Sequence, residues 1–124
     1  MSEVVVVADD EEDILLLVTV RLHRDGFEVV QARNGIEAIA RVQEHKPRVA
    51  VLDVGMPGLD GIEVLTAIRA DPELSGTRVL LLTAKAQESD VRRGFDAGAD
   101  AYMKKPFSPA ALAVRVREIY DGAL

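Results

Sequence analysis

Short apolar runs alternate along the chain with longer stretches in which apolar side chains recur every three or four residues. Runs of four to six residues that are rich in Val or Leu, and are bounded by charged residues, Gly or Pro, are typical of buried strands. Because the runs are nearly continuous rather than alternating, we expect both faces of each strand to be covered. The pattern predicts five strands, at residues 3–8, 27–31, 48–52, 78–82 and 100–103.

The longer stretches predict helices. The first is ambiguous, because "ILLLVTV" is also compatible with a strand. Acids crowd its first turn and Gly26 stands where a C-terminal cap belongs, and both features favour a helix. Ser108 and the proline after it similarly open the last stretch as N-cap and first helical residue. We expect helices at residues 11–24, 34–45, 61–70, 87–97 and 108–120.

Strands and helices therefore alternate five times. This order predicts an α/β protein with a parallel sheet and helices on both faces, a three-layer doubly wound (βα)5 arrangement. A chain of 124 residues suits one domain, and no long linker, low-complexity tract or internal repeat interrupts it.

Composition narrows the class of function. The formal net charge is −6, which argues against direct nucleic-acid binding and permits cationic partners or metal ions. The chain has no cysteine, so disulfides, thiolate catalysis and zinc–sulfur sites are excluded. No apolar run approaches the roughly 18 residues that span a bilayer, and the acidic N-terminus is unlike a signal peptide. We expect a soluble cytoplasmic protein that does not contact membranes.

The residues that follow the expected strands carry the candidate chemistry. Asp9 and Asp10 follow the first strand, and Asp53 follows the third. Thr83 follows the fourth strand, and Lys105 lies just beyond the fifth. Each has an ordinary structural explanation as a helix cap, a first-turn acid or a solvated side chain. Because parallel strands end at one edge of the sheet, we expect these groups to converge there.

Three carboxylates at one edge repel one another unless a cation lies between them. Two carboxylates about 5 Å apart repel by roughly 3 kcal/mol at an effective dielectric constant of about 20. Without Cys or a suitably spaced His pair, the available ligands are oxygens, which favour Mg²⁺ or Ca²⁺. Mg²⁺ fits better, because it accepts one or two carboxylates and leaves room for a phosphate. Such a site suits attack by a carboxylate on a phosphoryl group to give an aspartyl phosphate.

Four motifs in order resemble the response regulator receiver domain of two-component signalling. The resemblance covers essentially the whole chain, and it implies a flavodoxin-like fold with strand order 2-1-3-4-5 and a single receiver domain at residues 1–124. The motifs are the acid pair Asp9–Asp10, "DVGMPGLDG" at 53–61, "LLTA" at 81–84 and "GADAYMKKPF" at 98–107.

The resemblance implies a role for each acid. Asp53 is expected to be the phosphoacceptor and a ligand of Mg²⁺. Asp10 is expected to bind the metal directly and Asp9 through water, while the backbone carbonyl of Gly55 supplies a further ligand. The acids that follow Asp10 are assigned to the first turn of the helix, although Glu11 is near enough in sequence to reach the site.

The resemblance also implies a switch. Thr83 is expected to hydrogen-bond the phosphoryl group and Lys105 to pair with it, across a Lys–Pro bond that is often cis in the family. Tyr102 matches the aromatic residue that turns inward when Thr83 moves, although a half-buried strand aromatic is an equally simple explanation of it. Gly55, which lacks a side chain, and Lys85, two residues after Thr83, occupy positions that tune the lifetime of the phosphate.

The implied partner is a sensor histidine kinase or a phosphotransfer protein, and the implied role is signalling rather than enzymatic turnover. The exposed side of the first helix is the expected docking face, with burial of "ILLLV" as the alternative. The fourth helix, fifth strand and fifth helix form a possible homodimer face. Charged residues there, either paired across subunits or simply solvated, are Asp96, Asp100, Arg115 and Arg117.

Three rival functions remain open. A flavodoxin-like cofactor protein shares the fold, but acids stand where a phosphate loop belongs. A haloacid-dehalogenase-type phosphatase needs a second acid two residues after Asp53, where this chain has Gly55. A degenerate receiver acting as a phosphorylation-independent interaction module would lack part of the acid–Thr–Lys set, all of which is present.

Overall fold

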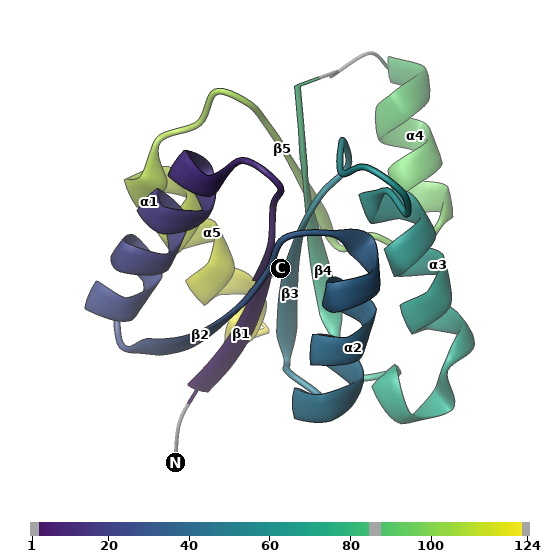
Figure 1. Ribbon diagram of the computed structural model, residues 1–124, viewed down its shortest axis with the longest axis horizontal. Helices are drawn as coiled ribbons and strands as arrows, with labels where there is room; N and C mark the ends of the chain where they lie inside the picture. Colours follow the sequence, from purple (N-terminus) through teal and green to yellow (C-terminus); the bar gives the residue numbers. More distant parts are fainter. Residues whose placement is uncertain (1–2, 85–87, 123–124) are drawn as a thin grey trace.

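A computed structural model describes residues 3–84 and 88–122. Five parallel strands form one sheet in the order β2-β1-β3-β4-β5, between two layers of helices (Figure 1). The predicted α/β fold class and strand order are confirmed. The elements are β1 (Glu3–Ala8), α1 (Glu12–Arg24), β2 (Phe27–Ala32), α2 (Gly35–His45), β3 (Val49–Asp53), α3 (Gly61–Ala70), the 3-10 helix η1 (Pro72–Leu74), β4 (Arg78–Thr83), α4 (Glu88–Asp96), β5 (Ala101–Lys104) and α5 (Pro109–Tyr120).

The alternation of side chains along each strand divides the core in two. Val5 and Val7 of β1 face the layer that holds α1 and α5, whereas Val6 and Ala8 face the opposite layer, which α2, α3 and α4 form (Figure 1). All four side chains are fully buried, as the nearly continuous apolar runs predict. The central strands are therefore held from both sides, and their carboxyl ends form a fixed platform.

The ambiguous first stretch is a helix, as its acidic first turn predicts. Glu12 and Asp13 lie in the first turn of α1, and Gly26 follows it with φ 97°, a conformation that favours glycine. Its apolar run is only partly buried. The inward residues Leu15, Val18 and Leu22 are buried, whereas the outward residues Leu16, Leu17 and Val20 are 57–59% exposed.

The buried face of α2 differs from the one that its larger residues suggest. Ile36 is 73% exposed, and the helix instead buries the small residues Gly35 and Ala38 together with Val42. A Cβ at Gly35 would lie 2.3 Å from the carbonyl oxygen of Leu59. Close approach of α2 to the segment that precedes α3 therefore decides which face turns inward.

Within the described residues, no helix is long and apolar enough to cross a membrane.

Candidate functional site

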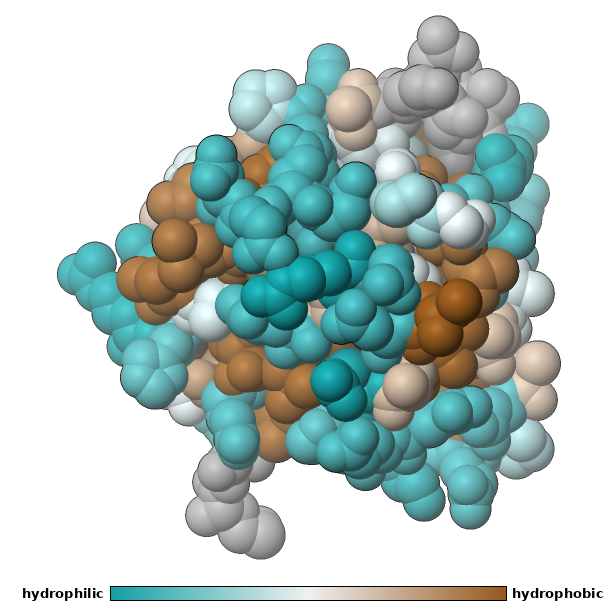
Figure 2. All heavy atoms as spheres, viewed as in Figure 1, coloured by the Kyte–Doolittle hydropathy of each residue, from teal (hydrophilic) through white to brown (hydrophobic). Residues whose placement is uncertain are grey.

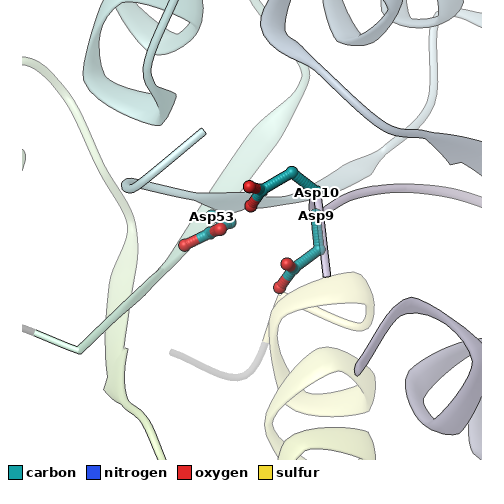
Figure 3. Close-up of side chains that lie close together, drawn as sticks. All are labelled: Asp9, Asp10 and Asp53. Atoms are coloured by element: carbon teal, nitrogen blue, oxygen red, sulfur yellow. The ribbon is translucent and has the colours of Figure 1, made fainter. Parts of the chain in front are cut away.

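Three carboxylates meet at the carboxyl edge of the sheet. Asp9 and Asp10 directly follow β1, and Asp53 is the last residue of the neighbouring strand β3. One oxygen from each lies within 4.8 Å of the others, and Figure 3 shows the three side chains gathered at their strand ends. Asp9 is 0% exposed and Asp53 is 4% exposed, while Asp10 is exposed. The sequence prediction that these acids converge is confirmed.

One ammonium group is shared among the acids. The Nζ of Lys105 lies 2.9 Å from Oδ2 of Asp9, 3.3 Å from Oδ1 of Asp53 and 3.2 Å from Oε1 of Glu11. The backbone N–H of Lys105 donates to the carbonyl of Thr83 at 2.7 Å, which fixes the lysine to the end of β4. The bond to Pro106 is cis, the isomer that the family resemblance implies. Glu11, which the sequence left between two roles, thus reaches the site.

Burial makes ionisation of Asp53 costly. Burial raises the pKa of the Asp53 carboxyl to about 6. The backbone N–H of Gly55 donates to Oδ1 at 3.1 Å, favours the charged form and so acts in the opposite direction. The negative charge of Asp9 raises this pKa further, and the charge of Lys105 opposes it. Burial alone would lower the pKa of Lys105, but its hydrogen bond to Asp9 and the charge of Asp53 outweigh burial and raise it. The ammonium therefore stays charged, yet it does not neutralise all the acids.

The donor set fits a small hard cation. Its members are carboxylate oxygens, the ligands that Mg²⁺ prefers. Oδ1 of Asp9 accepts the backbone N–H of Glu11 at 2.9 Å, so this acid also supports the turn into α1. Among the described residues, Oδ2 of Asp9 has the Lys105 ammonium 2.9 Å away and no further hydrogen-bond donor. Remaining lone pairs in a buried acidic cluster are what a bound cation requires.

The hydroxyl and the aromatic residue of the predicted switch lie on the α4 side of the sheet. Thr83 ends β4, is 3% exposed and lines the cavity above the acids. Tyr102 is half-buried on β5, and the centroid of its ring lies 6.3 Å from the centroid of the Phe95 ring. A Cβ at Gly94 of α4 would lie 3.3 Å from the Tyr102 ring, so this glycine leaves room for it. Lys85, the second predicted modulatory residue, lies outside the described residues.

A cavity of about 360 Å³ opens over these groups. Its walls come from the ends of β1, β3 and β4, the segment after β5, and the helices α3 and α4. Among the described wall residues, two charged ones were absent from the sequence-based set. Asp60 caps α3 in a reciprocal capping box with Glu63, and the motif "LDG" contains it. Arg93 of α4 is the other, and no spacing in the sequence indicates which face of this helix meets the site.

Two of the charged residues considered for a dimer face are paired within the chain. Asp100 accepts from Nη2 of Arg69 at 3.0 Å and from the N–H of Val79 at 2.8 Å. Arg117 donates to both carboxylate oxygens of Glu3 at 3.1 Å. Asp100 and Arg117, which the sequence left as either solvated or paired across subunits, therefore have partners within the chain itself.

Comparison with known proteins agrees with this geometry. A family model described as "Response regulator receiver domain" matches residues 5–117. The alkaline phosphatase synthesis transcriptional regulatory protein PhoP of Bacillus subtilis is 43% identical over 119 residues, which make up 96% of this chain and 49% of PhoP. The DNA-binding response regulator MtrA of Mycobacterium tuberculosis strain H37Rv is 38% identical over 117 residues, 94% of this chain and 50% of MtrA.

A solved structure shows the same fold. The chemotaxis protein CheY4 of Vibrio cholerae superposes with a TM-score of 0.90 at 30% identity, covering 96% of this chain and 99% of that chain. The chain spans about half the length of the curated relatives PhoP and MtrA, and nearly the whole length of CheY4.

Proposed function

The chain belongs to the response regulator receiver domain family, and on that premise we propose that it accepts a phosphoryl group on Asp53 in a two-component system. The observation that carries the proposal is the position of Asp53. Its carboxylate is buried at the end of a central strand, beside two further acids and 3.3 Å from the Lys105 ammonium. Neighbouring acids do not stabilise a carboxylate that has only a structural role. In a phosphoacceptor site, their negative charge serves to bind a cation.

The donor is a phosphohistidine on a sensor histidine kinase or a phosphotransfer protein. A carboxylate oxygen of Asp53 attacks phosphorus, so that a new P–O bond forms while the P–N bond breaks. The imidazole nitrogen keeps the electron pair of the broken bond. With its pKa at about 6, Asp53 is mostly ionised at neutral pH and therefore nucleophilic. The outcome is a signalling modification rather than repeated turnover of a substrate.

We assign the metal site to the same edge. Asp10 and Asp53 would hold Mg²⁺ directly, Asp9 through water, and Gly55 through its backbone carbonyl. Bound Mg²⁺ would neutralise negative charge on the phosphoryl oxygens. Lys105 would pair with those oxygens from its present position between Asp9 and Asp53.

Thr83 and Tyr102 form the proposed switch. The Thr83 hydroxyl would donate to a phosphoryl oxygen, because it ends β4 inside the cavity. Tyr102 would then turn further inward, over the space that Gly94 leaves against α4. Gly55 and Lys85 would tune the lifetime of the phosphate, Gly55 by leaving the approach to Asp53 without a side chain.

The partner would dock on α1. Figure 2 shows apolar side chains gathered on the flank that α1 forms, where Leu16, Leu17 and Val20 are exposed. An apolar cavity of about 440 Å³ lies between this helix and the segment after β5, and Lys105 lines both this cavity and the one above Asp53. Exposed apolar side chains beside an apolar cavity are typical of a protein–protein interface. Homodimerisation through α4, β5 and α5 would rely on exposed Phe95 and Val114 rather than on the paired Asp100 and Arg117.

Intact mass spectrometry after incubation with acetyl phosphate and Mg²⁺ tests the proposal. We expect a gain of one phosphoryl group, about 80 Da, on the native chain and none on Asp53→Asn. Asp13→Asn, which removes the same charge from an exposed position in α1, is the matched control and should still be modified. Modification that survives Asp53→Asn overturns the proposal.

A further inference from the structure

Among the described residues, Arg93 of α4 is a second cation in the lining of the Asp53 cavity, at an exposed position at its mouth, and neither the motifs nor the proposed chemistry uses it. We propose that Arg93 is a recognition residue for the phosphodonor, which attracts a donor of high negative charge as its phosphoryl group approaches Asp53. The inference rests on the proposed function of Asp53 and extends it to the selection of the donor. Arginine suits this role, because its planar guanidinium offers several N–H donors in a geometry that matches phosphate oxygens.

Among the described residues, the charges of the cavity lining provide no counter-ion for Arg93. The acids in this lining are Asp10, Glu11, Asp53 and Asp60. Lys105, which also lines the cavity, is already shared among Asp9, Glu11 and Asp53. In the part of the chain that the structure describes, the Arg93 side chain forms no ion pair or side-chain hydrogen bond. A guanidinium beside unbalanced acids, with no partner there, is available to an incoming anion.

The approach to Asp53 is open on its Gly55 side. A Cβ at Gly55 would lie 3.7 Å from Oδ1 and 4.0 Å from Oδ2 of Asp53, so a side chain at this position would begin in contact with the carboxylate. Without one, the phosphoryl group can be reached from the cavity mouth, where Arg93 lies. Lys105 comes from the segment after β5 and Arg93 from α4, so the two cations enter from different elements. Phosphoryl oxygens can therefore meet both.

The donor that this arrangement favours is a doubly charged one. An acidic cavity repels an anionic donor, and the repulsion grows with the donor's charge. A cation at the mouth offsets the repulsion most for a dianion. Acetyl phosphate is a dianion near neutral pH, whereas phosphoramidate is chiefly a monoanion, so the two small donors differ in charge while delivering the same phosphoryl group.

The experiment measures second-order rate constants of phosphorylation for both donors, at saturating Mg²⁺, by intact mass. We expect Arg93→Ala to lower the rate with acetyl phosphate by roughly threefold to tenfold, and the rate with phosphoramidate by less than twofold. Arg93→Lys should recover part of the loss. Arg92→Ala removes the same charge from the neighbouring residue of α4, which does not line the cavity, and should change either rate by less than twofold.

Binding of Mg²⁺ separates recognition from damage. Loss of a nearby cation leaves Mg²⁺ affinity unchanged or increases it, whereas distortion of the site weakens it. Equal losses for the two donors, equal losses in Arg92→Ala, or weaker Mg²⁺ binding in Arg93→Ala would each overturn the inference. If the native chain takes no phosphate from either donor, the proposed function itself fails. If the native chain is modified and Arg93→Ala behaves like it, only the role of Arg93 fails.

Discussion

Charged side chains are arranged in opposite ways at the two edges of the sheet. At the carboxyl edge, Asp9, Asp10 and Asp53 converge, and the Lys105 ammonium lies within 3.3 Å of Asp9 and Asp53. At the amino edge, the guanidinium of Arg117 binds both oxygens of Glu3 at 3.1 Å. Its Cζ also lies 4.1 Å from the centroid of the Phe27 ring. One edge gathers like charges, and the other holds the matched pair of Glu3 and Arg117.

The pKa values of Asp53 and Glu3 are shifted in opposite directions. Burial raises the pKa of Asp53 to about 6, because the charged form is poorly solvated and faces Asp9. At the amino edge the hydrogen bond from Arg117 lowers the pKa of Glu3 and raises that of Arg117 itself. The folded state therefore disfavours the charge of Asp53 and favours that of Glu3. Asp53 therefore has the character of a functional-site residue, whereas the Glu3–Arg117 pair supports the fold.

The aromatic residues of the amino edge complete this structural cluster. Phe27 and Tyr120 pack with their ring centroids 5.4 Å apart, and Arg48 lies 5.0 Å from the Tyr120 ring. The cluster connects the start of β1, the start of β2 and the end of α5. It thus closes the end of the fold that lies opposite the site.

Among the variants that separate the two edges, Asp53→Asn without Mg²⁺ should change the free energy of unfolding most. The folded-state pKa of Asp53 is raised from 3.8 to about 6, so the native chain loses stability as pH rises through this window. One pKa unit corresponds to about 1.4 kcal/mol, which sets an upper limit of about 3 kcal/mol above pH 7. We expect Asp53→Asn to raise the free energy of unfolding by roughly 1–3 kcal/mol at pH 8 and to change it little near pH 4. Urea denaturation at both pH values measures this, and lower stability at pH 8 would contradict the comparison.

Arg117→Ala should have the opposite sign. It removes the two hydrogen bonds to Glu3 and the stacking on Phe27, so we expect a loss of roughly 1–2 kcal/mol in unfolding free energy at neutral pH. Arg115→Ala, on the same helix with only a 4.0 Å pair to Glu118, serves as the control and should stay within about 0.5 kcal/mol. If both variants lose the same amount, the amino edge is an ordinary solvated surface.

Asp10→Asn should have the smallest effect. This side chain is exposed, belongs to the acidic cluster and contributes to the raised pKa of Asp53, so replacing its carboxylate without Mg²⁺ relieves repulsion. We expect an unchanged melting temperature, or a rise equivalent to at most about 1 kcal/mol. With Mg²⁺ added, the native chain should gain more stability than the variant. A clear drop without metal would make Asp10 a structural residue rather than a ligand.

Most of the fold, and the carboxyl edge in particular, was predictable from the sequence. Nearly continuous apolar runs define the strands, and parallel strands bring residues such as Asp9 and Asp53 to one edge whatever the details of packing. Boundaries agree within a residue or two. The sequence left Glu11 between the first turn of the helix and the site, and in the structure its Oε1 lies 3.2 Å from the Lys105 ammonium.

Features that depend on how helices pack were not predictable. Arg117 follows the helical pattern of α5, but its pairing with Glu3 joins two ends of the chain that only the finished fold brings together. Ile36 is apolar yet exposed, because the small residues beside it allow α2 to approach α3 closely. Arg93 meets the site because of the way α4 packs on β5, and its own helix contains no sign of this.

Locating the modified residue tests most directly whether Asp53 is the phosphoacceptor. The native chain is incubated with acetyl phosphate, with or without Mg²⁺, and then reduced with borohydride, which converts an aspartyl phosphate into homoserine. Peptide mapping by mass spectrometry should find homoserine at position 53, in the sample that contains Mg²⁺. Homoserine at another acid of the cluster, such as Asp10, or equal yields with and without Mg²⁺, would contradict the account.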